Sequence, residues 1–265
     1  MIKFCPLFSS SSGNSVYIGE NDAGVLVDVG RSAKQIREML SSIDVHESSI
    51  KAVFLTHEHA DHIDGLSVFL KRNNIPVYAS AGTILALKKK GVLTDCHMDL
   101  TLDDEKGVEV AGMLVKPFKT SHDCADGRGY TITGSDGSSK IAIATDTGVV
   151  TPEVMNAIKG CNLAYVESNH DVNMLKNGNY YFELKKRILS DKGHLSNDAC
   201  AELLKALVNN GTTQFVLAHL SLENNTPDLA YGTATHALTE MGALVNRDYL
   251  LRVAEPKNTQ KIVLV

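Results

Sequence analysis

The stretch that decides the fold of this 265-residue chain is Thr56-His57-Glu58-His59-Ala60-Asp61-His62. It follows the short apolar run 52–55, which is typical of a buried strand, and it places three imidazoles and a carboxylate within six residues. Imidazole nitrogens and carboxylate oxygens are ligands for zinc, iron or manganese. A lone histidine is usually structural, but four potential ligands at one strand end predict a metal site.

Further ligands are expected from distant strand ends, because one strand-to-helix loop cannot encircle a metal. Three residues share the required context, a ligand-type side chain soon after an apolar run: His122, Asp146 and His219. The predicted metal ligands are therefore His57, His59, Asp61, His62, His122, Asp146 and His219. Seven ligands with one shared carboxylate suit two metals and a bridging water, which is an arrangement used for hydrolysis.

Hydrophobic patterns along the chain predict an α/β protein. Strands are expected at 15–18, 24–29, 52–55, 76–79, 107–118, 129–133, 140–144, 163–166 and 214–218. Helices are expected at 32–40, 63–70, 83–90, 197–208 and 227–241. Strand-rich halves with helices appended indicate an α/β sandwich with helices outside two packed sheets. Without a repeat, a linker or a Pro-rich break, one domain over residues 1–265 is expected.

Composition excludes several other classes. The net charge of −5, from 26 basic and 31 acidic residues, does not indicate a nucleic-acid binder. No apolar run approaches the roughly 18–20 residues that span a bilayer, so no membrane association is expected. The N-terminus has no secretory signal pattern. The cysteines are scattered and never in C-x-x-C spacing, which predicts reduced thiols and a cytoplasmic location; they are Cys5, Cys96, Cys124, Cys161 and Cys200.

The same residues match a known family, because the chain resembles the metallo-β-lactamase-fold hydrolases. Their motif order is matched by Asp28 in Leu26-Val27-Asp28-Val29-Gly30, then by the histidine segment, His122, Asp146 and His219. The resemblance implies a four-layer αββα sandwich. It also implies one metal held by His57, His59 and His122, and another held by Asp61, His62 and His219, with Asp146 bridging. Asp28 would then orient a ligand by hydrogen bonds.

Four segments together narrow the resemblance to the YycJ/WalJ group of bacterial proteins: 8–15, 167–171, 188–197 and 217–221. Membership of this group implies a 5′-to-3′ DNA exonuclease that acts in DNA repair. The expected partners are then the 5′ end of single- or double-stranded DNA and repair proteins.

His194 lies just before an expected helix, in Lys192-Gly193-His194. It is either a loop histidine near a helix cap or a proton donor to the leaving alkoxide. Related phosphodiesterases such as tRNase Z use a Gly-His pair in the second way. We therefore predict Asp61 and His194 as catalytic residues.

The remaining candidates surround the predicted site. His170, which also follows an expected strand, is grouped with Asp28 as a residue that supports a ligand, and two other roles stay open: contacting the substrate, or a structural polar role further from the metals. The serine-rich run 9–15 is either a flexible loop or a phosphate-binding nest of backbone N–H groups. The predicted substrate-binding residues are Ser12, Asn14, Asn169 and Lys186. Lys186 belongs to a basic cluster that is more often a solvated helix face than a DNA-binding patch.

The predicted chemistry is phosphodiester hydrolysis by a metal-activated hydroxide, with His194 protonating the departing 3′-oxygen. One alternative on the same fold is a small-molecule phosphodiesterase, or an esterase, thioesterase or lactonase. Another is a non-catalytic regulatory partner that keeps its metals. A flavodiiron-type role is disfavoured, because that group has the pattern H-x-E-x-D-H and residue 59 of this chain is His, not Glu. The sequence leaves open manganese, zinc or iron as the two metals, and also the oligomeric state.

Overall fold

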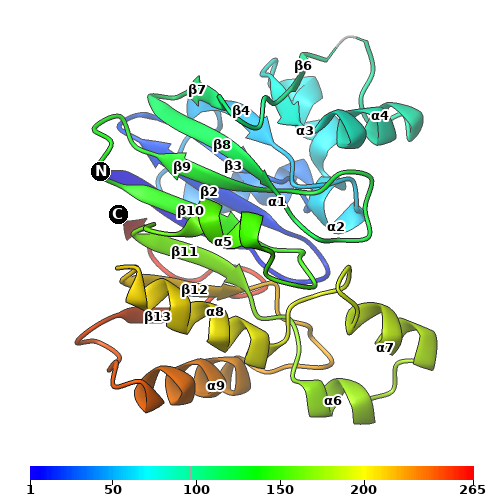
Figure 1. Cartoon of the computed structure of the whole chain (residues 1–265). Coiled ribbons are helices and arrows are strands. Elements are labelled where there is room, and N and C mark those ends of the chain that lie inside the picture. Colours follow the sequence, from blue (N-terminus) through cyan, green and yellow to red (C-terminus); the bar gives the residue numbers. More distant parts are fainter. Residues whose placement is uncertain (96) are drawn as a thin grey trace. The chain divides into compact units, whose positions relative to one another are not determined.

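The computed structural model describes residues 1–95 and 97–265 (Figure 1). Its internal contacts divide the chain into two compact units. Unit 1 comprises Met1–Phe118, Cys124–Ser139 and Glu255–Val265, and unit 2 comprises Lys119–Asp123 and Lys140–Ala254. The expectation of a single domain stays a prediction.

Unit 1 contains a sheet whose strands run in the order β14-β1-β2-β3-β4-β5-β6. β14, β1, β2 and β3 pair antiparallel, whereas β3 to β6 pair parallel. The strands are β1 (Ile2–Phe8), β2 (Ser15–Glu20), β3 (Ala23–Val27), β4 (Ile50–Phe54), β5 (Val77–Ala79), β6 (Asp99–Thr101) and β14 (Val263–Leu264).

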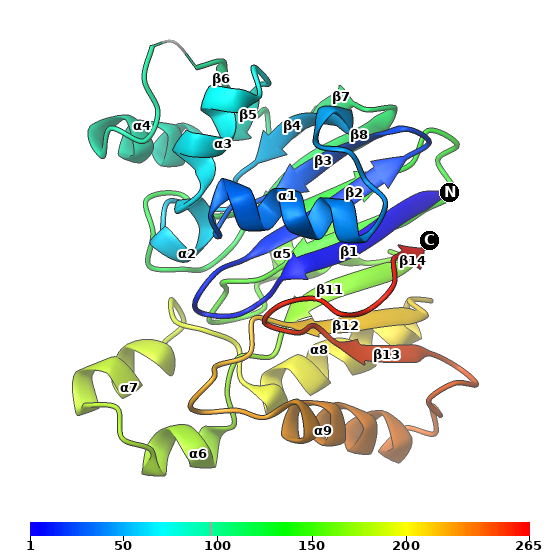
Figure 2. The ribbon, with the colours of Figure 1, turned by 180° about the vertical axis from the view of Figure 1, so that it is seen from behind.

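Helices cover one face of this sheet, as α1 does in Figure 2. The helices of unit 1 are α1 (Ala33–Ser42), α2 (Ala60–Ile63), α3 (Leu66–Arg72) and α4 (Ala81–Lys89), with a 3₁₀ turn at Glu47–Ser49. Ile36, Phe69 and Leu87, one from each of three helices, are buried in one apolar cluster with strand residues such as Val53. This packing joins the strand before the histidine segment to a rigid core.

The rest of unit 1 contains β7 (Val108–Val110), β8 (Met113–Lys119) and β9 (Arg128–Thr133). The prediction of one strand over 107–118 is wrong at its centre, because β7 and β8 form an antiparallel hairpin. Ala111 and Gly112 both have positive φ, 56° and 77°, as a two-residue hairpin turn requires.

Unit 2 is built on four parallel strands in the order β10-β11-β12-β13. They are β10 (Lys140–Ala144), β11 (Leu163–Glu167), β12 (Gln214–Ala218) and β13 (Leu250–Val253). The helices are α5 (Pro152–Ile158), α6 (Val172–Asn177), α7 (Phe182–Ile188), α8 (Asn197–Asn209) and α9 (Pro227–Glu240). Nearly every residue of β10 to β12 is buried, as expected for a parallel sheet covered by helices.

Two predictions about environment can be compared with these units. None of the described helices has the length and apolarity that a membrane crossing requires. Cys5, Cys161 and Cys200 are buried thiols, and burial raises the pKa of Cys5 and of Cys200 to about 12. Cys96, one of the thiols expected to be reduced, lies outside the described residues.

Candidate metal centre

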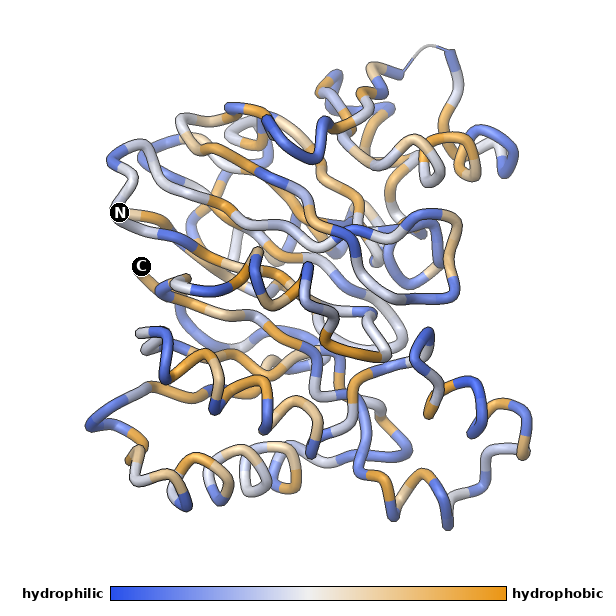
Figure 3. Tube along the Cα trace, viewed as in Figure 1, coloured by the Kyte–Doolittle hydropathy of each residue, from blue (hydrophilic) through white to orange (hydrophobic). Residues whose placement is uncertain are grey.

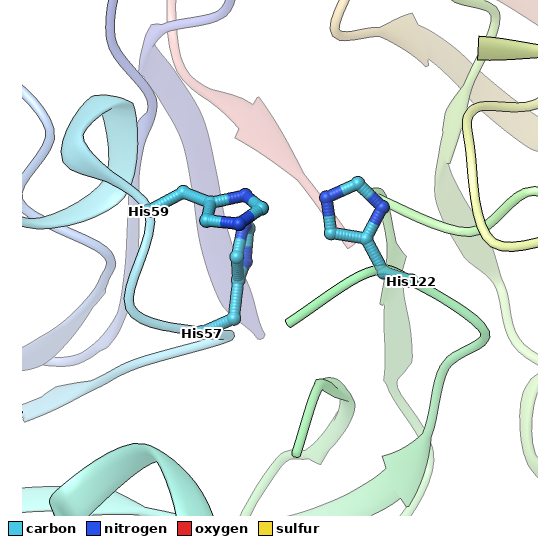
Figure 4. Close-up of side chains that lie close together, drawn as sticks. All are labelled: His57, His59 and His122. Carbon is cyan, nitrogen blue, oxygen red and sulfur yellow. The ribbon is translucent and has the colours of Figure 1, made fainter. Parts of the chain in front are cut away.

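The histidine segment of unit 1 folds back so that its three imidazoles lie together. His57 and His62 are each 1% exposed. The ring centroid of His57 lies 4.5 Å from that of His59 and 4.2 Å from that of His62; Figure 4 shows the first pair. His59 is the N-cap residue of α2 but makes no side-chain capping bond. The short helix therefore positions the imidazoles and does not use them for its own stability.

Asp28 fixes the orientation of His62. One of its carboxylate oxygens lies 2.7 Å from Nδ1 of His62, and the carboxylate also accepts bonds from the backbone N–H and the hydroxyl of Thr56. Burial raises the pKa of the Asp28 carboxyl, although His62 and Thr56 oppose that rise. Because an ionised carboxylate can only accept, Nδ1 of His62 is the donor, and Nε2 keeps the lone pair that a metal needs.

The predicted substrate-binding residues of the N-terminal loop lie in different places. Asn14 is buried, and its amide nitrogen lies 3.2 Å from Oδ2 of Asp61 and 3.1 Å from Nε2 of His62. Ser12 is exposed, and its hydroxyl accepts a hydrogen bond from Arg31. Within unit 1, Asn14 therefore contacts candidate ligands, whereas Ser12 contacts the half-buried side chain of Arg31.

In unit 2, Asp146 and His219 follow the carboxyl ends of β10 and β12. Both lie in the left-handed backbone region, with φ of 56° and 55°, which is uncommon for residues other than glycine. This turn brings Nδ1 of His219 within 3.3 Å of Oδ1 of Asp146. Nε2 of His122 lies 3.8 Å from the same oxygen. Three ligand candidates that are far apart in sequence thus meet within one unit.

Glu167, the last residue of β11, is a central residue of unit 2 that the sequence reasoning missed. It is 0% exposed. Its Oε1 lies 2.8 Å from Nδ1 of both His194 and His219, and its Oε2 accepts the backbone N–H groups of Thr147 and Leu195. Burial alone would raise the pKa of Glu167, but the His194 charge and these bonds more than offset it, so the pKa lies well below its usual range.

A sequence signal for Glu167 existed. The residue directly follows the apolar run 163–166, the same context that identified Asp146 and His219. Ligand-type atoms of Asp146, Glu167, His194 and His219 all lie within 4.8 Å of one another. Applied to every strand of the parallel sheet, the strand-end rule therefore marks Asp146, Glu167 and His219, whereas His194 lies between two helices.

His122 is held by the loop that carries His194. Its Nδ1 lies 2.9 Å from the carbonyl oxygen of Gly193, to which it donates. The neighbouring Asp123 pairs with Arg187 of α7. Asp123 is thus bound to a cation, whereas the His122 side chain is 1% exposed.

The other predicted residues of unit 2 lie at different depths. Asn169 is buried, and its amide donates to the carbonyl oxygen of His219. His170 is 1% exposed, and neither ring nitrogen has a hydrogen-bond partner among the described residues. Burial lowers the pKa of His170 to about 4, with the Glu167 charge opposing that shift. Lys186 is exposed on α7. His170 and Asn169 are thus buried, whereas Lys186 faces solvent.

The donor chemistry of both units suits divalent metals. Three candidate imidazoles have one nitrogen held by an oxygen acceptor: His62 by Asp28, His219 by Glu167 and His122 by Gly193. Metal-binding histidines characteristically have such an acceptor, which fixes the tautomer and leaves the other nitrogen for the ion.

Comparisons with known proteins agree with this chemistry. The model of the Beta-lactamase superfamily domain matches residues 24–220. The chain is 35% identical over 266 residues to Exodeoxyribonuclease YycJ of Bacillus anthracis, covering 100% of this chain and 99% of the relative. It is 33% identical over 256 residues to Exodeoxyribonuclease WalJ of Streptococcus pneumoniae serotype 2, covering 96% and 94%.

The fold is shared with solved structures as well. The metallo-beta-lactamase fold protein YhfI from Bacillus subtilis superimposes with a TM-score of 0.73 at 16% identity, covering 97% of this chain and 98% of YhfI. The predicted αββα sandwich of the metallo-β-lactamase fold is confirmed.

Proposed function

We propose that this chain, which belongs to the β-lactamase superfamily and to its YycJ/WalJ group, is a metal-dependent exodeoxyribonuclease that digests DNA from the 5′ end. One observation carries the proposal: the chain is similar over its whole length to relatives named as exodeoxyribonucleases. The His and Asp clusters of its two units support it, because they have the donor chemistry of a metallohydrolase.

The proposed ligand set follows the pattern of the family. By that pattern, His57, His59 and His122 would hold one divalent metal, and Asp61, His62 and His219 would hold the other, with Asp146 shared. The family pattern supports this assignment, together with the acceptor behind an imidazole in each unit. Bound manganese, zinc or iron would supply an activated water and neutralise phosphate charge.

The chain's own residues handle the proton of the leaving group. Because Glu167 accepts from Nδ1 of His194, the second ring nitrogen is free to carry a proton to the departing 3′-oxygen. Asn169 holds His219 through its backbone carbonyl, so its proposed contribution is to position a ligand next to the substrate.

Digestion of end-labelled duplex DNA, with manganese or zinc added, tests the activity and its polarity. A 5′ label should appear at once as a mononucleotide, whereas a 3′ label should pass through a ladder of shortened strands. The opposite pattern would reverse the polarity. If DNA stays intact while a thioester, a lactone or bis-p-nitrophenyl phosphate is turned over, the small-molecule alternative replaces the nuclease. Metal-loaded protein that is inert on all of these substrates would indicate the regulatory alternative.

A role in DNA repair in the cytoplasm completes the proposal. Deletion of the gene should sensitise its host to a DNA crosslinking agent, and the wild-type gene, but not one encoding Asp146→Ala, should restore resistance. If the deletion strain and its parent are equally resistant, the nuclease has no role in the repair of such damage.

A further inference from the structure

The segment between β11 and α8 presents two large aromatic side chains to solvent. Tyr181 is 68% exposed and Phe182 is 74% exposed, at the junction that leads into α7. Figures 1 and 2 show α6 and α7 to the side of the sheet strands of unit 2. In Figure 3 the tube of this segment alternates between hydrophilic and hydrophobic residues. We call residues 172–188 the aromatic arm.

The fold of the arm does not depend on these two aromatics. Leu175 and Ile188 are its buried residues, 0% and 8% exposed. The ammonium of Lys185 donates to the carbonyl oxygens of Lys176 and Gly178, at 2.8 and 2.7 Å, and so ties α7 to the end of α6. Tyr181 is the N-cap residue of α7 but makes no side-chain capping bond. An exposed pair with no packing or capping role points to a ligand.

The charge around the arm differs from that of the whole chain. Residues 171–195 contain five basic and three acidic side chains, although the chain as a whole carries −5. The ammonium of Lys185 already donates hydrogen bonds within the arm, and Arg187 is bound to Asp123. Lys186 is exposed and follows Phe182 by one turn of α7, so it is the cation of the basic cluster that is available for a phosphate.

The arm is joined directly to the loop that carries His194. The N–H of His194 donates to the carbonyl oxygen of Ile188, the last residue of α7, at 3.0 Å. Gly193 permits this approach, because a Cβ at position 193 would lie 2.1 Å from that same oxygen. A DNA strand bound to the arm would therefore be linked to His194, the proposed proton donor, through a short, hydrogen-bonded connection.

We infer that Tyr181 and Phe182 form a stacking platform for the unpaired bases of a single-stranded DNA end, with Lys186 contacting its backbone. Aromatic faces next to a cation are how proteins hold single strands without reading their sequence. The surface therefore deepens the proposed nuclease function, on which it rests, by specifying single-stranded ends as the preferred substrate class.

The chain contains no tryptophan, so Phe182→Trp creates a single fluorescent reporter on the arm. Titration of this variant, with its metals bound, with phosphorothioate oligothymidine, which resists cleavage, should quench its fluorescence saturably. Tyr231→Trp on α9 is the matched control, since Tyr231 is a 36% exposed aromatic of the same unit, and its fluorescence should not change. Equal responses of the two reporters, or no quenching of Phe182→Trp, would overturn the proposal. So would a spectral change with protein concentration alone, because it would assign the aromatics to a second copy of the chain.

The double variant Tyr181→Ala/Phe182→Ala tests the role of the arm in turnover. Each lost stack should weaken oligothymidine binding roughly 5- to 150-fold, and KM for DNA with a single-stranded 5′ end should rise while kcat stays close to wild type. Turnover of bis-p-nitrophenyl phosphate, which is too small to reach the arm, should be unchanged. If the double variant cleaves DNA with an unchanged KM, the stacking platform is refuted and the nuclease proposal stands. A wild-type protein that cleaves no DNA would refute the nuclease proposal, and the fluorescence titration would still decide whether the arm binds single strands.

Discussion

The two units hold their candidate ligands in different ways. Unit 1 supplies them from one short segment, which Asp28 and Asn14 hold in place by hydrogen bonds. Unit 2 supplies them one at a time from separate strand ends, and a single buried carboxylate, Glu167, binds two imidazoles at once. Local sequence therefore determines the geometry in unit 1, whereas the register of a parallel sheet determines it in unit 2.

The largest expected effect is the loss of activity when a proposed metal ligand of either unit is replaced. His59→Ala in unit 1 and Asp146→Ala in unit 2 should each lower kcat/KM for DNA at least about 10³-fold, because each removes a proposed ligand worth several kcal/mol to the transition state. His236→Ala is the matched control, since that imidazole is exposed on α9. Circular dichroism should show the same fold for all three variants. Wild-type activity of either ligand variant would contradict the proposed ligand set.

A smaller effect should separate the two units. Glu167→Gln places an amide NH₂ among groups that all donate to the carboxylate, so it should misorient His194. DNA cleavage should fall roughly 10²-fold, the lower end of what a general acid contributes. Turnover of bis-p-nitrophenyl phosphate should fall less than about tenfold, because its leaving group needs little protonation. Equal losses on both substrates would show that Glu167 acts only through the ligand His219.

Asp28→Asn is the corresponding change in unit 1. It should weaken metal binding about 10- to 100-fold, as loss of an acceptor behind a metal-bound histidine does. Both substrates should therefore lose activity by the same factor, and excess metal should restore both. Metal titrations followed with each substrate check this. A defect confined to DNA would assign Asp28 a role beyond orienting His62.

The contrast between the units explains what the sequence could predict. The histidine segment could be predicted because its ligands are close together in the sequence. The capped helices α1 and α8 could be predicted because Ser32 and Ser196 precede clear apolar periodicity. β1 was missed because Pro6 interrupts its pattern, and the pairing with β2 shifts register there. The helices α6 and α7 bury one residue each, Leu175 and Ile188, so they give no periodic apolar signal. Burial of Asn14 and Asn169 is a tertiary property that composition does not reveal.

The smallest expected effect lies in the N-terminal loop, where the sequence treated Ser12 and Asn14 alike. Asn14→Ala removes the amide that contacts Asp61 and His62, so kcat/KM should fall several-fold, in line with the roughly 1 kcal/mol that one hydrogen bond contributes. Ser12→Ala removes an exposed hydroxyl bonded to Arg31, so activity should change less than about twofold. Steady-state kinetics on DNA and on bis-p-nitrophenyl phosphate distinguish the two roles. If Ser12→Ala raises KM for DNA alone, the loop binds phosphate as the sequence suggested, and Asn14 is then the residue that anchors the loop to the ligand segment.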